Sequence, residues 1–275
     1  MKTGRRTAAV AALVGALGLS TLNASTAHAA DTGITVSDIV INKGKPILVG
    51  TTKVVEPPLS FRITLPRGYS TANPFSYGGE PFLYRGSITR ATDTGDNYIG
   101  PGSYICYEVD SRRARCEGHL YINPEPSQEH VDSNSDATSW KVGVALQLWK
   151  PSGGFLTGEL ETRSLTVPLR RVSKTTVDAS PEPVTRGRTV TVTGKLTRAN
   201  WSTKRYDGYG DRTASLQFRA KGTDAFTTVK KATTSRTGAL RTTVTASVDG
   251  YYRWVYQGDS ATGPATSTAD FVDVR

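Results

Sequence analysis

The side chains best suited to bind a ligand lie in one polar stretch near the C-terminus. Residues 199–212 read ANWSTKRYDGYGDR and hold three aromatic rings and three cations. Aromatic faces stack on sugar rings, and cations attract anionic polymers. The alternative is that Trp201 packs over the end of its domain, as a large loop aromatic usually does. The candidate ligand residues are Trp201, Lys204, Arg205, Tyr206, Tyr209 and Arg212.

A second loop carries oxygen ligands that would suit a calcium ion. Asp93, Asp96 and Asn97 stand close together in the sequence DTGDN. Calcium prefers carboxylate and amide oxygens, but this spacing does not fit an EF-hand loop. Loops rich in Asp and Asn mostly form turns held by their own side chains. We therefore predict an ordinary turn, with calcium as the alternative, and no cofactor.

The sequence contains none of the catalytic motifs that we tested. Beyond residue 29, the histidines are His119 and His130, and neither has a His or Cys partner at metal-ligand spacing. No G-x-S-x-G sequence occurs. Carboxylates such as Glu108 and Glu117 are plentiful, but their pairing cannot be derived from sequence. We predict a non-enzymatic protein, with an enzyme whose site lies at the domain interface as an alternative.

The N-terminal residues have the pattern of a cleaved secretory signal peptide. Residues 2–6 include three basic and no acidic side chains, and residues 8–22 are apolar. Ala27 and Ala29 form an A-x-A cleavage site. Residues 1–29 are therefore predicted to direct secretion into the extracellular space. No second apolar run is long enough to span a membrane.

Export makes the cysteines interpretable. Cys106 and Cys116 are the only two, and they flank the polar turn 110–113 at similar distances. Exported proteins mature in an oxidising compartment, where a disulfide is the default state of such a pair. The sequence therefore predicts a disulfide across a β-hairpin.

Alternation of apolar and polar residues runs through the whole chain. Residues 140–148 and 189–198 alternate with a period of two, which is typical of half-buried strands. Residues 69–81, rich in Gly, Pro, Ser and Asn, are predicted to form a loop. Many short strands separated by turn signals favour β-sandwiches. We expect an all-β protein with two sandwich domains in tandem, residues 30–172 and 173–275, and leave the oligomeric state open.

Charge is concentrated in the second domain. Residues 31–172 hold 15 basic and 15 acidic side chains, whereas residues 173–275 hold 16 basic and 9 acidic, a net charge of +7. Lys195, Arg219 and Lys221 occupy outward positions of predicted strands. This imbalance favours an anionic cell-wall polymer or a glycan as partner. No nucleic-acid reading motif is present, so dedicated nucleic-acid binding is not expected.

The end of the chain resembles a known kind of domain. Residues 250–274, GYYRWVYQGDSATGPATSTADFVDV, place Gly250 and Tyr252 before alternating aromatics, then a Gly258-Asp259 turn, then a return strand rich in Ser and Thr. This pattern is similar to the last two strands of bacterial Ig-like domains, and residues 180–198 look like their first strands. The whole arrangement resembles secreted bacterial proteins of unknown function. The resemblance implies an Ig-like β-sandwich and no catalytic residues.

These observations predict a secreted, non-enzymatic binding or interaction protein of the cell envelope or the extracellular space. A carbohydrate-binding module that uses Trp201, Tyr206 and Tyr209 is the alternative from the same residues. Fold alone does not select between these functions.

Overall fold

The computed structural model describes residues 31–88, 97–125 and 131–275. The predicted signal peptide, including Ala27 and Ala29, lies outside these residues. So do His130 and two of the calcium candidates, Asp93 and Asp96. Asn97 is described and follows directly after them in the chain.

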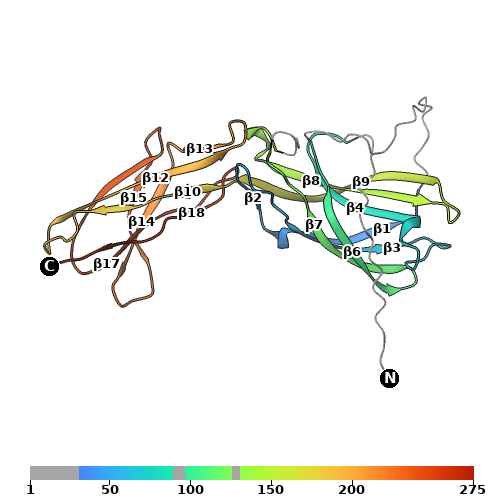
Figure 1. Cartoon of the computed structure of the whole chain (residues 1–275), viewed down its shortest axis with the longest axis horizontal. Coiled ribbons are helices and arrows are strands. Elements are labelled where there is room, and N and C mark those ends of the chain that lie inside the picture. Colours follow the sequence, from blue (N-terminus) through green and yellow to red (C-terminus); the bar gives the residue numbers. More distant parts are fainter. Residues whose placement is uncertain (1–30, 89–96, 126–130) are drawn as a thin grey trace, which may run out of the picture. The chain divides into compact units, whose positions relative to one another are not determined.

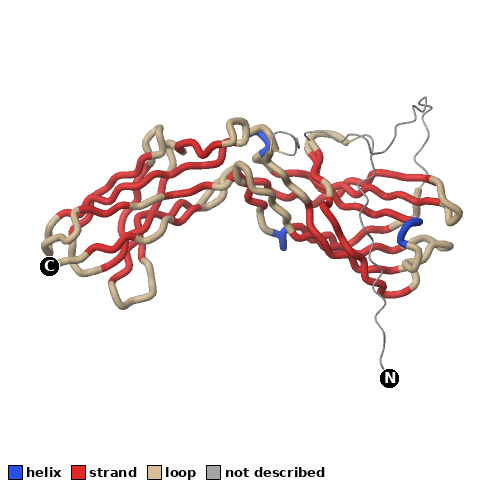
Figure 2. Tube along the Cα trace, in the orientation of Figure 1, coloured by secondary structure: helices blue, strands red, loops and turns tan. Residues whose placement is uncertain are grey.

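The described chain consists mainly of β-strands joined by loops, with very little helix (Figure 2). Short 3₁₀ helices occur at η1 (Asn42–Gly44), η2 (Pro74–Ser76) and η4 (Asn134–Asp136). No helix in the described ranges has the length and apolar character needed to cross a bilayer. The all-β prediction is therefore confirmed.

The chain divides into two compact units, each with its strands labelled in Figure 1. Of the described residues, unit 1 comprises 31–47, 54–88, 97–125, 131 and 139–168, and unit 2 comprises Leu48–Lys53, Asp132–Thr138 and Leu169–Arg275.

Two sheets build unit 1. The first has the order β1 (Thr35–Ile41), β3 (Pro58–Thr64), β7 (Arg113–Leu120) and β6 (Pro101–Asp110). The second has the order β2 (Ile47–Val49), β9 (Phe155–Arg171), β8 (Ser139–Trp149), β4 (Tyr77–Tyr84) and β5 (Tyr98–Ile99).

The core of unit 1 lies where these two sheets approach each other. Phe61 and Ile63 of β3 and Val144 and Leu146 of β8 are all buried. A Cβ on Gly79 of β4 would stand 2.7 Å from the Ile63 side chain, so a larger residue would require the Ile63 side chain to move. The predicted sandwich architecture is confirmed for this unit, although β4 begins inside the predicted loop 69–81.

The predicted disulfide is present. Cys106 of β6 and Cys116 of β7 stand directly opposite each other, with their Cα atoms 4.0 Å apart. Both side chains are buried, so the bridge forms part of the inner face of the first sheet. It fastens an edge strand to the strand beside it.

Replacing both Cys106 and Cys116 by Ala should lower the free energy of unfolding of the chain by about 2–3 kcal/mol, because the bridge restricts the unfolded chain. Chemical denaturation of the wild type and the variant under oxidising conditions measures this loss. A reductant should reproduce the loss in the wild type and leave the variant unchanged; equal stability of the two proteins would contradict the prediction.

Two sheets also build unit 2. The first is centred on β12 (Thr189–Asn200), with which β10 (Ser173–Thr175), β11 (Asp178–Ser180), β13 (Arg205–Gly208) and β16 (Ala239–Thr245) all pair. The second contains β15 (Thr227–Thr233), β14 (Thr213–Ala220) and β17 (Gly250–Tyr256) in that order, with β18 (Ala265–Thr266) and β19 (Asp270–Val272) both paired to β17.

The strand order of unit 2 is that of an Ig-like sandwich. β11, β12 and β16 share one sheet, as strands A, B and E do in that fold. β14, β15, β17 and β19 share the other, as strands C, C′, F and G do. The chain passes from one sheet to the other between β12 and β14, between β15 and β16, and between β16 and β17. The Ig-like prediction is therefore confirmed as a β-sandwich.

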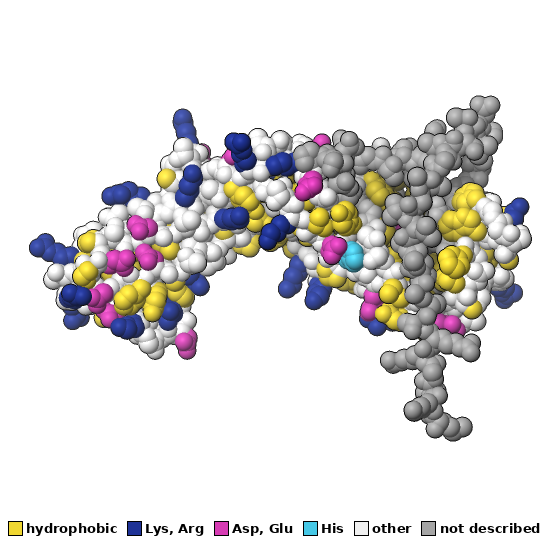
Figure 3. Space-filling view, viewed as in Figure 1, with side chains coloured by type: hydrophobic (Ala, Val, Ile, Leu, Met, Phe, Trp, Pro, Cys, Tyr) yellow, Lys and Arg dark blue, Asp and Glu magenta, His cyan; other side chains and the backbone are white. Residues whose placement is uncertain are grey.

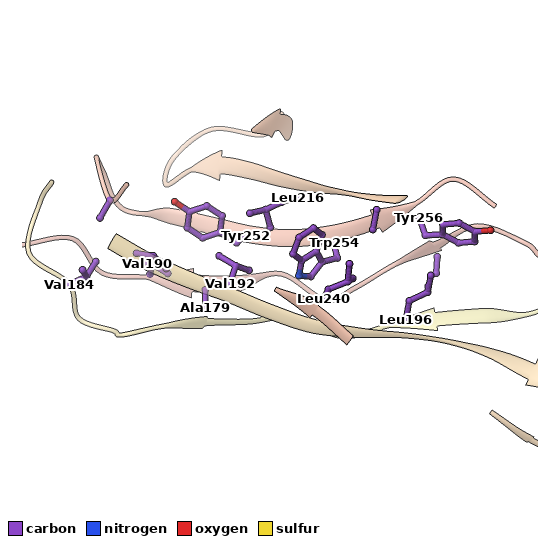
Figure 4. Packing of buried hydrophobic residues seen from close by; sticks show 14 of the residues in the cluster. Ala179, Val184, Val190, Val192, Leu196, Leu216, Leu240, Tyr252, Trp254 and Tyr256 are labelled. Atoms are coloured by element: carbon purple, nitrogen blue, oxygen red, sulfur yellow. The ribbon is translucent and has the colours of Figure 1, made fainter. Parts of the chain in front are cut away.

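Trp254 lies at the centre of the unit 2 core. Figure 4 shows Trp254, Tyr252 and Leu216 pointing from the second sheet toward Val192 and Leu240 of the first. The indole ring is fully buried, and its Nε1 donates a hydrogen bond to the carbonyl of Thr193 at 3.0 Å. This bond satisfies the one polar atom of the ring while the rest of it fills the space between the sheets.

Gly194→Ala should destabilise unit 2 by about 1–3 kcal/mol, because overpacking forces neighbouring atoms to move. A Cβ on this residue would stand 2.3 Å from the carbonyl oxygen of Thr176 and 2.8 Å from the Trp254 ring. Thermal or denaturant unfolding measures the change. Lys195→Ala, at the exposed next position of β12, is the matched control and should be nearly neutral; equal losses would contradict the packing argument.

The predicted domain limits differ from the observed division. The sequence suggested 30–172 and 173–275, whereas the units separate between Pro168 and Leu169, inside strand β9. The apolar alternation of β9 continues across this point, so the sequence gives no local signal for it.

Two short segments from the first predicted domain belong to unit 2. In residues 48–53, the carbonyl of Val49 accepts a hydrogen bond from the backbone of Val172 at 2.9 Å. In residues 132–138, Asn134 accepts a 2.6 Å bond from the guanidinium of the last residue of β9. Long-range hydrogen bonds, which composition does not reveal, attach both segments.

Candidate functional site

The predicted ligand stretch 199–212 forms an ordered hairpin. After β12 the chain turns and returns as β13, with Ala199 opposite Tyr206 and Asn200 opposite Arg205. The sequence analysis expected a loop over this whole stretch. Backbone pairing fixes the direction of the side chains at 199–200 and 205–208, whereas residues 201–204 form the turn between the two strands.

Trp201 is fully buried. Its Nε1 donates to the carbonyl of Val49 at 3.2 Å, and its backbone N–H donates to Asn134 Oδ1 at 3.0 Å. The ring therefore packs inside the unit, and its faces are not open to a sugar. This corrects the expectation that Trp201 presents a stacking platform.

Cations of unit 2 itself cover the two tyrosines of the hairpin. The Lys174 ammonium lies 3.7 Å from the centre of the Tyr206 ring. The guanidinium carbons of Arg198 and Arg212 lie 3.9 and 4.6 Å from the centre of the Tyr209 ring. Such stacks are favourable because the ring face carries negative charge. These rings are consequently occupied by protein cations.

The other two candidates of this stretch, Lys204 and Arg205, do not belong to the tyrosine stack, the name we give to Tyr209 with Arg198 and Arg212 on its ring. Lys204 is half-buried, and burial lowers the pKa of its ammonium. Arg205 is exposed on β13. The structure thus brings Tyr209 and Arg212 together but does not gather all six predicted residues into one site.

Asp259 accepts hydrogen bonds from the tyrosine hydroxyls at this end of unit 2. The hydroxyls of Tyr209 and Tyr256 both donate to its Oδ2, the second at 2.8 Å, and the Ala261 N–H donates to its Oδ1 at 2.9 Å. Partial burial raises the pKa of this carboxyl, but the donated hydrogen bonds outweigh burial and lower it from 3.8 to about 2. Asp259 is therefore a charged anchor for the ring of Tyr209.

Asp259→Asn should lower the free energy of unfolding at neutral pH by about 1–2 kcal/mol, since an amide accepts these bonds more weakly than a carboxylate. The carboxyl pKa is lower in the folded state, so its stabilisation is present above about pH 4 and is lost as the pH falls toward 2. Denaturant unfolding as a function of pH checks both expectations.

The wild type and Asp259→Asn should therefore converge in stability near pH 2. Asp224→Asn, an exposed turn substitution, serves as control and should follow the wild type throughout. A difference between wild type and Asp259→Asn that is the same at neutral and acidic pH would contradict the role of the charge.

A second arrangement of cations and aromatic rings covers the outer surface of the second sheet of unit 2. Cross-strand pairs place Gln217 opposite Arg253 and Arg219 opposite Tyr251, on the side of β14 and β17 away from Trp254. We call this surface the basic–aromatic face. Its members are Arg219, Lys221, Phe226, Tyr251, Arg253 and Phe271.

The two arginines of the basic–aromatic face are held in place by rings. The guanidinium carbon of Arg253 lies 3.8 Å from the centre of the Phe226 ring, and that of Arg219 lies 5.3 Å from the same ring. Arg219 also lies 4.3 Å from the centre of the Tyr251 ring. Arg253 thus packs against one ring and Arg219 against two, and such contacts with a ring leave the N–H donors in the guanidinium plane available for other bonds.

Hydrogen bonds fix the same arginines further. Arg253 Nε donates to Gln217 Oε1 at 2.9 Å, and Arg219 donates to the carbonyl of Thr223 at 2.6 Å. Lys221 is already paired, because its ammonium lies 3.3 Å from Asp249. Arg219 and Arg253 are therefore the principal positive groups of this face.

Lys195, the third outward cation of the prediction, lies on a different surface. It belongs to β12 in the first sheet, whereas Arg219 belongs to β14 in the second. Figure 3 shows Lys and Arg side chains along much of the visible surface of unit 2. The sequence identified the outward positions but did not show which of them share a sheet.

The described residues include no cluster of three His, Cys, Asp or Glu side chains suited to a metal. His119 of β7 lies 3.7 Å from Glu56.

The sequence did not indicate a half-buried carboxyl, Glu80 of β4. Burial raises its pKa, and it accepts a hydrogen bond from the Tyr104 hydroxyl. Burial likewise raises the pKa of Tyr98 to about 12. We interpret Glu80, Tyr98 and Tyr104 as packing residues where β4 lies near β6.

No protein-family model and no curated protein matches the chain. Among solved structures, the full ectodomain (Ig1–Ig3) of mouse nectin-like molecule 4 is 12% identical, with a TM-score of 0.26 over 86% of this chain and 65% of that one. The fibronectin(III)-like modules of Clostridium thermocellum CbhA are 13% identical, with a TM-score of 0.28 over 88% and 92%. The D0–D1 domain of intimin is 11% identical, with a TM-score of 0.27 over 86% and 98%.

This chain spans less than two thirds of the nectin-like ectodomain. These likenesses concern the β-sandwich fold and transfer no ligand or residue role to the chain.

Proposed function

We propose that this is a secreted, non-enzymatic binding protein of the bacterial cell envelope, and that unit 2 attaches it to an anionic polymer. The observation that carries the proposal is the basic–aromatic face, where two half-buried arginines are held on the outer side of the second sheet. Their guanidinium groups are fixed by Phe226, Tyr251 and Gln217 before any ligand arrives. Preorganised donors lose little side-chain entropy on binding.

The charge of the unit supports the same ligand class. Residues 173–275 carry a net charge of +7, whereas residues 31–172 are neutral. A positive surface raises the local concentration of an anionic polymer and speeds its encounter. Guanidinium groups also match phosphate and carboxylate geometry through paired N–H donors. A phosphate- or carboxylate-bearing wall polymer therefore fits this surface better than a neutral glycan does.

The direct test is co-sedimentation of residues 30–275 with purified bacterial cell walls at low and high salt. Binding should be strong at about 0.1 M salt and nearly absent at about 1 M, where the screening length falls from about 10 Å to about 3 Å. Arg219→Gln combined with Arg253→Gln should weaken binding roughly fivefold, as expected for about 1 kcal/mol of exposed charge contacts.

The matched control is Lys195→Gln combined with Arg241→Gln. It removes two exposed positive charges from the first sheet of the same unit and keeps the net charge equal to that of the first variant. It should retain most of the binding. Equal weakening by both double variants would show that net charge alone acts, and salt-resistant binding would show that the polymer is not held by charge.

A further inference from the structure

Strand β6 is the outermost strand of the first sheet of unit 1, and its solvent-facing side is apolar. It spans ten residues, Pro101–Asp110, and in the described chain it pairs with β7 alone. Ile105, Tyr107 and Val109 are 40, 45 and 57% exposed on one side of it. A long apolar edge strand is a template for pairing with another strand.

The backbone of β6 also has its free hydrogen-bonding groups in a defined phase. The Cα atoms of Cys106 and Cys116 are 4.0 Å apart, which is the close spacing of a non-hydrogen-bonded pair. The hydrogen bonds of β7 agree with this spacing. Leu120 is four residues from Cys116, so its backbone groups point the same way, and its N–H donates to the carbonyl of Pro57, on the side of β3 and away from β6. The N–H and C=O groups of Tyr104, Cys106 and Glu108 therefore point away from β7, toward the open edge.

We propose that this edge pairs with β6 of a second copy of the chain, in an antiparallel arrangement with a twofold axis at Cys106. In that register Tyr104 lies opposite Glu108 of the other copy, and Ile105 lies opposite Tyr107. Outward backbone groups meet outward backbone groups, and no like charges face each other. Aromatic–β-branched pairs are among the favourable cross-strand pairs, and a twofold interface uses the same patch on both copies.

The composition of β6 favours this self-pairing. Natural edge strands are usually protected by lysine or by proline within the strand. β6 reads PGSYICYEVD, with no basic residue and with its proline at the first position. By contrast, the edge strand β15 of unit 2 carries Lys230 and Lys231. The disulfide joins β6 to β7, so the backbone of the free edge keeps a fixed extended conformation to which a second strand can pair.

Sedimentation equilibrium of residues 30–275 at concentrations up to about 1 mM tests the proposal. We expect a reversible monomer–dimer equilibrium. Tyr107→Lys should weaken dimerisation at least about tenfold, since the substitution enters the symmetric interface twice and places an ammonium beside an apolar side chain. Val229→Lys, an exposed apolar position of β15, should leave it unchanged.

Hydrogen exchange read by NMR makes the test specific for the edge. The amides of Tyr104, Cys106 and Glu108 should gain protection as the protein concentration rises, whereas those of Ile105 and Tyr107, bonded within the sheet, should not. A purely monomeric protein at all concentrations would overturn the proposal. So would a dimer that persists in Tyr107→Lys, or one whose formation leaves the β6 amides unprotected and therefore uses another surface.

Discussion

The packing of Trp254 between the sheets of unit 2 is the interaction on which the candidate binding surface depends. Its ring is fully buried, and its Nε1 bonds to the carbonyl of Thr193 in the opposite sheet. Gly194 leaves the space that the ring needs. Since side chains alternate along a strand, placing Trp254 inward places its neighbour Arg253 outward. The core therefore sets the geometry of the basic–aromatic face on the other side of the same strand.

Stacking of cations on aromatic rings recurs in unit 2, with two different consequences. Around Tyr209, the ring is buried, two guanidiniums cover it, and Asp259 accepts the Tyr209 hydroxyl bond and lies 3.9 Å from Arg212. On the outer surface of the second sheet, Arg219 and Arg253 are half-buried against Phe226 and Tyr251, and among the described residues neither forms an ion pair with a carboxylate. The first arrangement stabilises the end of the unit, and the second leaves donors for a ligand.

Sequence periodicity predicted the strands whose two sides differ in burial, such as β8 and β12, because a period of two directly records which side faces the core. It missed the start of β4, where Gly79 reflects the close approach of two sheets and not a turn. For the proposed site, composition indicated unit 2 and a combination of cations and aromatic rings. It could not show that Trp201 is buried, since its partner Val49 lies far away in the sequence.

The most direct measurement of the account follows the arginine Nε–H resonances of the chain by NMR while inorganic polyphosphate is added as a model anionic polymer. Arg219 and Arg253 should shift progressively, because neither is paired with a carboxylate in the part of the chain that the structure describes. Arg198 and Arg212 should change little, because both stack on the Tyr209 ring that Asp259 anchors. Shifts confined to Arg198 and Arg212 would contradict the central claim and place binding at the tyrosine stack; shifts of similar size at all four would show that the polymer selects neither surface.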